Sequence, residues 1–164
     1  RKRLCRTQSA EYGIGEIMAL RDIVKDPNPT LRKICRPVEI FDDKLGRLLD
    51  DMKETMIKAD GVGLAGPQVG ILRRVAVVMV DDFYIEFVNP VIVKTKGSQI
   101  GPEACLSVPN KSGNVKRPFR VTVDYQDRHG KEMSVTAEGF IARAFCHEID
   151  HLDGKLYYDF IEEK

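Results

Sequence analysis

The sequence has almost no net charge and no long apolar segment. Lysine and arginine total 26 residues against 25 aspartate and glutamate residues, which gives a net charge of +1 at pH 7. This balance predicts neither a nucleic-acid-binding groove nor an anchor on an acidic membrane surface. No apolar run approaches the roughly 20 residues of a membrane-spanning helix, and no secretory hydrophobic segment is visible. These absences predict a soluble protein.

Cysteine is also sparse, with four residues in a chain of 164. The chain is 43% hydrophobic, enough for one compact domain with its own core, so it does not require disulfide bonds. We therefore predict reduced thiols in a cytosolic compartment, at least one of them available as a metal ligand. Cys146 is expected in the core, and His129 in a solvated turn.

Residues 1–17 differ in character from the rest of the chain. They begin with the basic cluster Arg1-Lys2-Arg3, show no clear periodicity and precede the first methionine, Met18. We interpret them as a tag, a presequence remnant or an N-terminal extension. Residues 18–164 are predicted to form a single domain.

The hydrophobic pattern predicts a helix, several strands and a second helix. Apolar residues at helical spacing indicate a helix over residues 41–59, with Asp42 or Asp43 at its start and Gly61 after its end. Strands are expected at residues 73–80, 83–88, 91–95, 120–125 and 132–136. The second helix covers about residues 137–152. This order predicts an α+β fold, with mostly antiparallel β-sheets packed around the second helix.

Two of the three histidines lie four residues apart in the second predicted helix, where the sequence reads HEIDH from His147 to His151. Residues i and i+4 share one face of a helix, so both imidazoles can bind one metal ion. Glu148 can then accept a proton from an activated water. A solvated polar face is the alternative, but residues 140–145 are largely apolar and Gly154 provides a stop, which indicates a buried helix. The pattern predicts an active site on a central metal-binding helix.

A catalytic site of this type usually has three protein ligands and an open fourth position. Zincin-type proteases supply the third ligand after the motif, but the 13 residues that follow His151 contain no extended zincin signature. Two upstream segments stand out, GVGLAGPQ at residues 61–68 and EACLS at residues 103–107.

These two segments and HEIDHLDG, in this order, resemble the three motifs of the peptide deformylases. The resemblance covers residues 18–161 and implies a catalytic domain that removes the N-formyl group from the N-terminal methionine of new polypeptides, releasing formate. By this resemblance, the metal ligands are Cys105, His147 and His151, and the acid/base is Glu148. The donors to the substrate carbonyl oxygen are Gln68 and the backbone N–H of Leu106. The peptide-binding residues are Gly61, Val62 and Gly63.

The resemblance also implies a cofactor and partners. A thiolate with two imidazoles suits Fe(II), Zn or Ni, so we expect one divalent ion, Fe(II) in the cell and Zn or Ni in isolated protein. The substrates would be N-formylmethionyl nascent peptides, held by an apolar pocket of Val62, Phe140 and Ala144. We expect a monomer with transient ribosome contact, no nucleic-acid or membrane binding, and a place in the bacterial cytoplasm or, alternatively, an organelle of bacterial descent.

Two residues depart from the family motifs. Gly66 replaces an alanine and is expected to add local freedom, whereas Ala104 replaces a glycine where a positive φ is favoured. Around the ligands, Glu103 and Asp150 are expected to orient side chains, and Arg117 is a candidate partner for Glu103.

Two other functions fit parts of the pattern. A zincin-like metallopeptidase would cleave internal peptide bonds and need no formyl group. A structural Cys/His metal-binding module would surround its ion with four protein ligands and leave no open position.

Overall fold

The computed structural model describes residues 19–162. The predicted segment 1–17 lies outside this range. The strands are β1 (Gly63–Ala65), β2 (Val75–Val80), β3 (Phe83–Lys96), β4 (Gln99–Cys105), β5 (Val108–Arg117), β6 (Arg120–Gln126) and β7 (Glu132–Glu138). The helices are η1 (Pro29–Arg32), α2 (Asp43–Lys58), η2 (Gly66–Val69), α3 (Gly139–Leu152) and η3 (Tyr157–Phe160). None of the helices in this range is long and apolar enough to cross a membrane.

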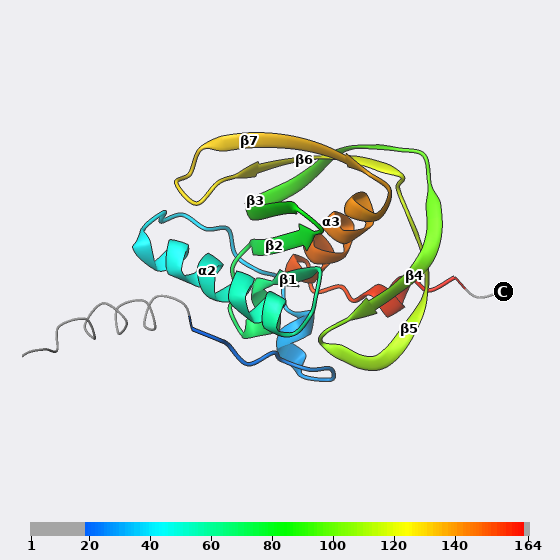
Figure 1. Ribbon diagram of the computed structural model, residues 1–164, viewed down its shortest axis with the longest axis horizontal. Coiled ribbons are helices and arrows are strands. Elements are labelled where there is room, and N and C mark those ends of the chain that lie inside the picture. Colours follow the sequence, from blue (N-terminus) through cyan, green and yellow to red (C-terminus); the bar gives the residue numbers. More distant parts are fainter. Residues whose placement is uncertain (1–18, 163–164) are drawn as a thin grey trace, which may run out of the picture.

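The strands form two antiparallel sheets (Figure 1). Five of them lie in the order β1-β2-β3-β6-β7, and the other two, β4 and β5, pair as a separate hairpin. With two α-helices beside them, these sheets confirm the predicted α+β class with mostly antiparallel strands. The short strand β1 lies at one edge of the larger sheet and, among the described residues, pairs with β2 alone.

Helix α2 confirms the predicted first helix. The side chain of Asp42 accepts a hydrogen bond from the backbone N–H of Leu45 and so caps the first turn. Leu49, Met52 and Met56 follow at helical spacing and are fully buried in one core cluster with residues of β1 and β2. This packing fixes the position of α2, after which the chain continues into the glycine-rich segment 61–63.

Strand β3 is continuous where the sequence predicted two strands, and the predicted break at Asn89-Pro90 is wrong. Asn89 has a positive φ of 52°, and the register with β6 shifts between Val88 and Val91. The Asn89 side chain accepts from the Val38 N–H at 2.8 Å and donates to the Val38 carbonyl at 3.0 Å. The strand therefore accommodates Pro90 in a bulge instead of ending there.

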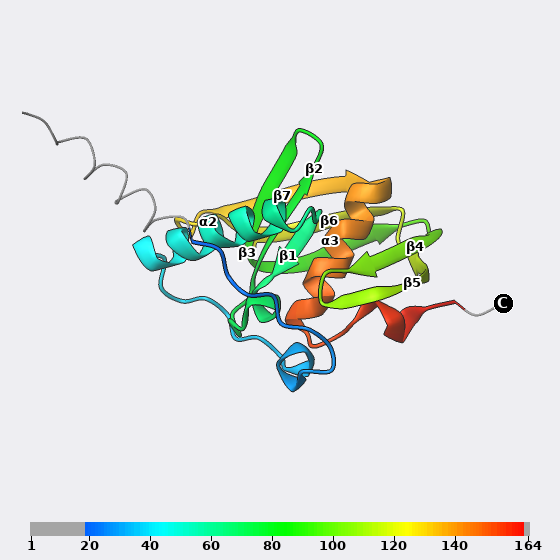
Figure 2. The same ribbon diagram turned by 60° about the horizontal axis from the view of Figure 1, so that its bottom comes forward.

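Helix α3 lies between the five-stranded sheet and the β4–β5 hairpin (Figure 2). Phe145 and Ile149 pack with Phe87 and Val123 of the large sheet. The opposite side of the helix faces the hairpin, which the sequence analysis did not predict. Two sheets on either side of one helix place residues from distant parts of the chain around its polar side chains.

Candidate active site

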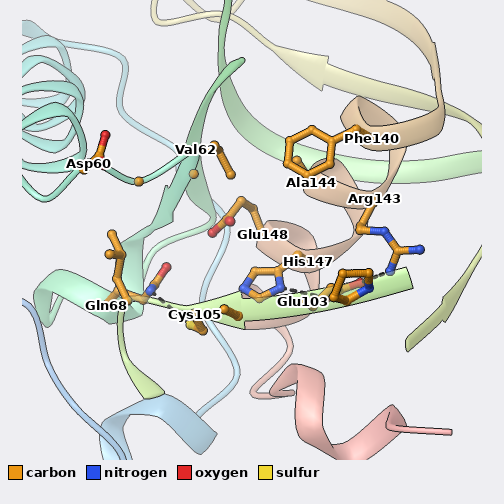
Figure 3. Close-up of a pocket in the computed structure, with 15 residues that line it drawn as sticks. Asp60, Val62, Gln68, Glu103, Cys105, Phe140, Arg143, Ala144, His147 and Glu148 are labelled. Carbon is orange, nitrogen blue, oxygen red and sulfur yellow. Dashed lines mark hydrogen bonds and ion pairs between the residues drawn. The ribbon is translucent and has the colours of Figure 1, made fainter. Parts of the chain in front are cut away.

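A cavity of about 350 Å³ opens between β1, the end of β4 and helix α3 (Figure 3). Its lining includes eight of the nine residues that the family resemblance assigned to the site: Gly61, Val62, Gly63, Gln68, Cys105, Leu106, His147 and Glu148. His151 is 1% exposed and lies outside this lining. The expected pocket residues Val62, Phe140 and Ala144 also line the cavity.

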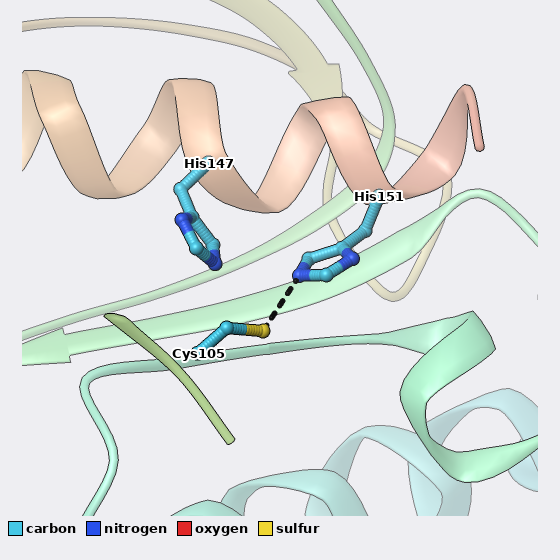
Figure 4. A group of neighbouring side chains, drawn as sticks. All are labelled: Cys105, His147 and His151. Atoms are coloured by element: carbon cyan, nitrogen blue, oxygen red, sulfur yellow. Dashed lines mark hydrogen bonds between the residues drawn. The ribbon is translucent and has the colours of Figure 1, made fainter. Parts of the chain in front are cut away.

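Cys105, His147 and His151 come together beside the cavity (Figure 4). One ligand atom from each lies within 4.8 Å of the others, and Sγ of Cys105 is 3.4 Å from Nε2 of His151. Strand β4 brings the thiol, and one face of α3 brings both imidazoles. A sulfur and two nitrogens at this spacing are a donor set that one transition-metal ion can occupy.

The two imidazoles differ in their affinity for protons. Burial opposes protonation of His147, but the Cys105 thiol and the Glu103 carboxylate outweigh it and raise the pKa of His147 to about 10. Burial and the neighbouring His147 hold the pKa of His151 well below its ordinary value. His151 is therefore a neutral donor, whereas a metal ion would compete with a proton at His147.

Glu148 is enclosed against the glycine-rich segment. Its side chain is 3% exposed, and its Oε1 has no hydrogen-bond partner among the described residues. Burial raises the pKa of Glu148 to about 7. A Cβ on Gly63 would lie 2.8 Å from Cγ of Glu148 and still closer to its carboxylate. Glycine at position 63 therefore provides the space for a carboxyl group that exchanges protons near neutral pH.

Glu103 connects His147 to two arginines. Its Oε1 is 2.9 Å from Nδ1 of His147, while Arg117 donates to both of its oxygens at 2.8 Å. Arg143 adds a third partner, through Nη1 to Oε2 at 2.7 Å. Burial would raise the pKa of Glu103, but Arg117 and His147 together lower it to about 2. The expected Arg117–Glu103 pair is present, and Asp150 accepts from Arg117 at 2.6 Å.

Gln68 is fixed on both sides of its amide. Its Oε1 accepts from the backbone N–H of Ala65 at 2.9 Å, and its Nε2 donates to Oγ of Ser107 at 3.1 Å. The same Nε2 is 3.6 Å from Sγ of Cys105. Leu106 is in the turn that joins β4 to β5, directly after Cys105. The thiol of Cys105 is therefore bordered by the Gln68 amide, from η2, and by the turn that joins β4 to β5.

The two departures from the family motifs have different consequences. Ala104 is not among the described residues with positive φ, so its Cβ introduces no backbone strain. The expectation that Gly66 adds local freedom is wrong. A Cβ there would lie 2.6 Å from the carbonyl oxygen of Ile71 and 2.7 Å from that of Arg73. The chain packs closely against Gly66.

Three residues of the site were not identified in the sequence. Ser107 orients Gln68, Arg143 binds Glu103, and the ring of Tyr157 stacks on His147 with centroids 6.0 Å apart. Arg143 precedes His147 by four residues, so the helical spacing that paired the histidines also placed it on their face. Ser107 and Tyr157 depend on contacts between distant segments, which no local pattern indicated.

Comparisons with known proteins agree with this geometry. The profile of the family described as Polypeptide deformylase matches residues 20–164. A peptide deformylase of Caldicellulosiruptor bescii is 54% identical over 142 residues, covering 87% of this chain and 86% of the relative. The crystal structure of peptide deformylase from Thermotoga maritima superposes with a TM-score of 0.86 at 39% identity, covering 88% of this chain and 99% of that one. A peptide deformylase structure from Legionella pneumophila gives a TM-score of 0.85 at 44% identity, covering 88% of this chain and 87% of that one.

Proposed function

The chain belongs to the polypeptide deformylase family, hydrolases that remove the formyl group from the N-terminal methionine of new polypeptides, and we propose that it does so in the cavity between β1, β4 and α3. The observation that carries this proposal is the buried Glu148 carboxyl group, with a pKa near 7, beside the donor set of Cys105, His147 and His151. Residues 18–164 would form the single catalytic domain.

Cys105, His147 and His151 would hold one divalent metal ion. A soft thiolate with two imidazoles suits Fe(II), Zn or Ni and disfavours Mg or Ca. The three donors are close together, and two of them line the cavity, so a fourth position can face the substrate. When bound, such an ion acts as a Lewis acid that makes water nucleophilic at neutral pH. We expect Fe(II) in the cell and Zn or Ni in protein purified in air.

Glu148 would act as the acid/base. It accepts a proton as water adds to the formyl carbon, and it returns that proton to the peptide nitrogen as the C–N bond breaks. The products are formate and a free N-terminal amine. A carboxyl group with a pKa near 7 can perform both transfers, because neither its protonated nor its ionised form is strongly favoured at neutral pH.

Gln68 and the backbone N–H of Leu106 would stabilise the negative charge that develops on the formyl oxygen. The hydrogen bonds from Ala65 and to Ser107 fix the Gln68 amide before substrate binds. Donors fixed in this way need little rearrangement during the reaction. Removal of one such donor typically costs about 2.7–4 kcal/mol in the barrier.

The peptide would bind along Gly61, Val62 and Gly63. Strand β1 begins at Gly63 and, within residues 19–162, pairs only with β2, so its other edge can accept an extended chain as an added strand. Val62 and Phe140 are 42% and 53% exposed, and both border the cavity. Together with Ala144 they supply an apolar surface for the methionine side chain.

We further propose a monomer in the bacterial cytoplasm that contacts the ribosome transiently. At the ribosome the protein would meet nascent formylated chains. The bacterial location follows from the relatives compared above, which are bacterial. An organelle of bacterial descent is the alternative location.

The direct test is formate release from formyl-Met-Ala-Ser by anaerobic protein loaded with Fe(II). The acetyl-Met-Ala-Ser peptide is the matched control, and a deformylase should hydrolyse it far more slowly. Cleavage of an internal peptide bond without formate release would instead support a zincin-like metallopeptidase. A tightly bound ion without any hydrolysis would support a structural Cys/His module.

A further inference from the structure

Residues 24–26, which precede η1, join two separate parts of the site proposed to bind the formyl oxygen. The N–H of Val24 donates to the backbone carbonyl of Gln68 at 2.7 Å, and the N–H of Asp26 donates to that of Ser107 at 2.8 Å. Figure 2 shows this segment in blue, running from α2 towards the turn that joins β4 to β5. One short stretch of chain therefore holds both η2 and that turn.

The two donors proposed for the formyl oxygen lie on different elements. Gln68 is in η2, whereas the N–H of Leu106 is in the turn between β4 and β5. Nε2 of Gln68 donates to Oγ of Ser107 at 3.1 Å, which links the two elements through side chains. Val24 and Asp26 link them a second time through the backbone. Donors whose separation is fixed before the reaction need little rearrangement as charge develops on the oxygen.

The bridging segment is itself fastened at both ends. Oδ1 of Asp26 accepts from the hydroxyl of Tyr158 at 2.9 Å, and the Tyr158 ring packs against the core cluster of β5. On the other side, Arg21 lies 2.9 Å from the carboxylate of Asp51, and its N–H donates to Oγ1 of Thr55 at 2.9 Å. Asp51 and Thr55 are buried on α2. The segment can therefore resist a movement of the two elements that it joins.

We propose that Asp26 is a positioning residue: it holds the turn that carries the Leu106 N–H at a fixed distance from the Gln68 amide. This rests on the proposed function and makes the N-terminal segment part of the site. Asp26 acts through its N–H on Ser107, and its own place is set by Tyr158. Because the two donors matter most when charge develops on the formyl oxygen, a loosened segment lowers kcat and leaves substrate binding nearly unchanged.

The test measures kcat and KM for formyl-Met-Ala-Ser in metal-loaded protein, with kcat expressed per bound metal ion. Asp26→Ala loses the acceptor for Tyr158 and should lower kcat about tenfold, a part of the 10²- to 10³-fold cost of removing one such donor, with KM nearly unchanged. Asp26→Asn keeps an acceptor oxygen and should restore kcat to within about threefold of the wild type. Asp22→Ala, an exposed substitution in the same segment, is the control and should leave kcat unchanged.

A double variant separates positioning from general support of the fold. In a Gln68→Ala background one of the two donors is already absent, so Asp26→Ala should lower kcat by only about threefold or less. Equal losses in the two backgrounds, or wild-type kcat in Asp26→Ala, would overturn the proposal. Tyr158→Phe removes the same hydrogen bond from its other side and should reproduce the loss, which decides the matter if Asp26→Ala does not fold.

Hydrogen exchange of the Gln68 side-chain amide tests the positioning without catalysis. This side chain is 1% exposed, and its Nε2 donates to Ser107, so its exchange should be slow in the wild type and in Asp22→Ala. In Asp26→Ala it should be about tenfold faster or more. Equal exchange in the wild type and Asp26→Ala would overturn the role of Asp26. A wild type that releases no formate would overturn the proposed function, and the exchange rates would still decide whether Asp26 positions Gln68.

Discussion

Oε1 of Glu103 lies 2.9 Å from Nδ1 of His147, across 44 residues of sequence. The contact joins β4 to α3 and sets the orientation of one imidazole of the candidate metal site. Because Arg117 and Arg143 also contact this carboxylate, its position is fixed from three directions.

Glu103→Gln should weaken metal binding. The amide cannot accept from two arginines and His147 together, so the imidazole loses its orientation. Loss of such a partner typically lowers metal affinity about 10- to 100-fold. Competition with a coloured chelator measures the change, and Glu132→Gln, an exposed site on β7, is the control. Equal affinity in both variants would show that Glu103 does not orient the ligand.

Gly63→Ala should reduce activity through Glu148. The added Cβ would overlap the Glu148 side chain, and a displacement of about 1 Å at a catalytic group can cost 10²-fold in rate. We expect kcat/KM to fall by about 100-fold or more. The control is Gly46→Ala on α2, where the nearest atom to the new Cβ is Nη1 of Arg128 at 3.4 Å. Wild-type kcat/KM in Gly63→Ala would contradict the placement of Glu148.

Removal of the metal should lower thermal stability. An ion that binds only the folded state stabilises it by about 2.7 kcal/mol at a concentration of 100 Kd. For a domain of this size, the melting temperature should rise by about 5–10 °C on loading. Calorimetry of chelated and reloaded protein measures the difference. Cys105→Ser should show a much smaller rise, and an equal rise would remove Cys105 from the ligand set.

Cys35 gives a prediction for pH dependence away from the site. Burial raises the pKa of its thiol to about 11, and the nearby Arg74 only partly opposes this. Because the folded pKa lies above the unfolded value of about 9, this contribution to stability is complete below pH 9 and is lost as the pH rises through 11.

Urea unfolding at pH 8 and pH 11 tests this assignment. Between these two values the wild type should lose about 2 kcal/mol more stability than Cys35→Ala, whose alanine cannot ionise. Equal losses would mean that the Cys35 thiol ionises as easily in the folded chain as in the unfolded one.

Local patterns in the sequence predicted both long helices and four of the five strands of the larger sheet; the short edge strand β1 was missed. Helical spacing located α2 and α3, and alternating valines located β6. The β4–β5 hairpin was missed because its segments, QIGPEAC and VPNKSGNVKR, contain proline, glycine and asparagine at positions where strands usually have β-branched residues. The C-terminal segment packs on this hairpin: Ile161 bridges to Val115 and fills the space over Gly113. Such long-range contacts leave no periodic signal.

The residues of the site, like the elements of the fold, were predicted only in part from the sequence. The spacing of His147 and His151 predicted their common face, and Cys105 followed from the family motifs. The environment of these residues was predicted only in part, with Arg117 as a partner for Glu103. The Glu103 contacts and the Ser107–Gln68 hydrogen bond join segments 14 to 44 residues apart. The close packing around Gly66 could not be predicted either, because its neighbours are the backbone carbonyl groups of Ile71 and Arg73.

The most direct test of the account is formate release from formyl-Met-Ala-Ser by wild type and Glu148→Gln, with bound metal quantified in both. The amide keeps the size of the side chain but cannot take up the proton, so the variant should keep its metal and lose about 10²- to 10⁴-fold in kcat. A Glu148→Gln protein that releases formate at the wild-type rate would contradict the account.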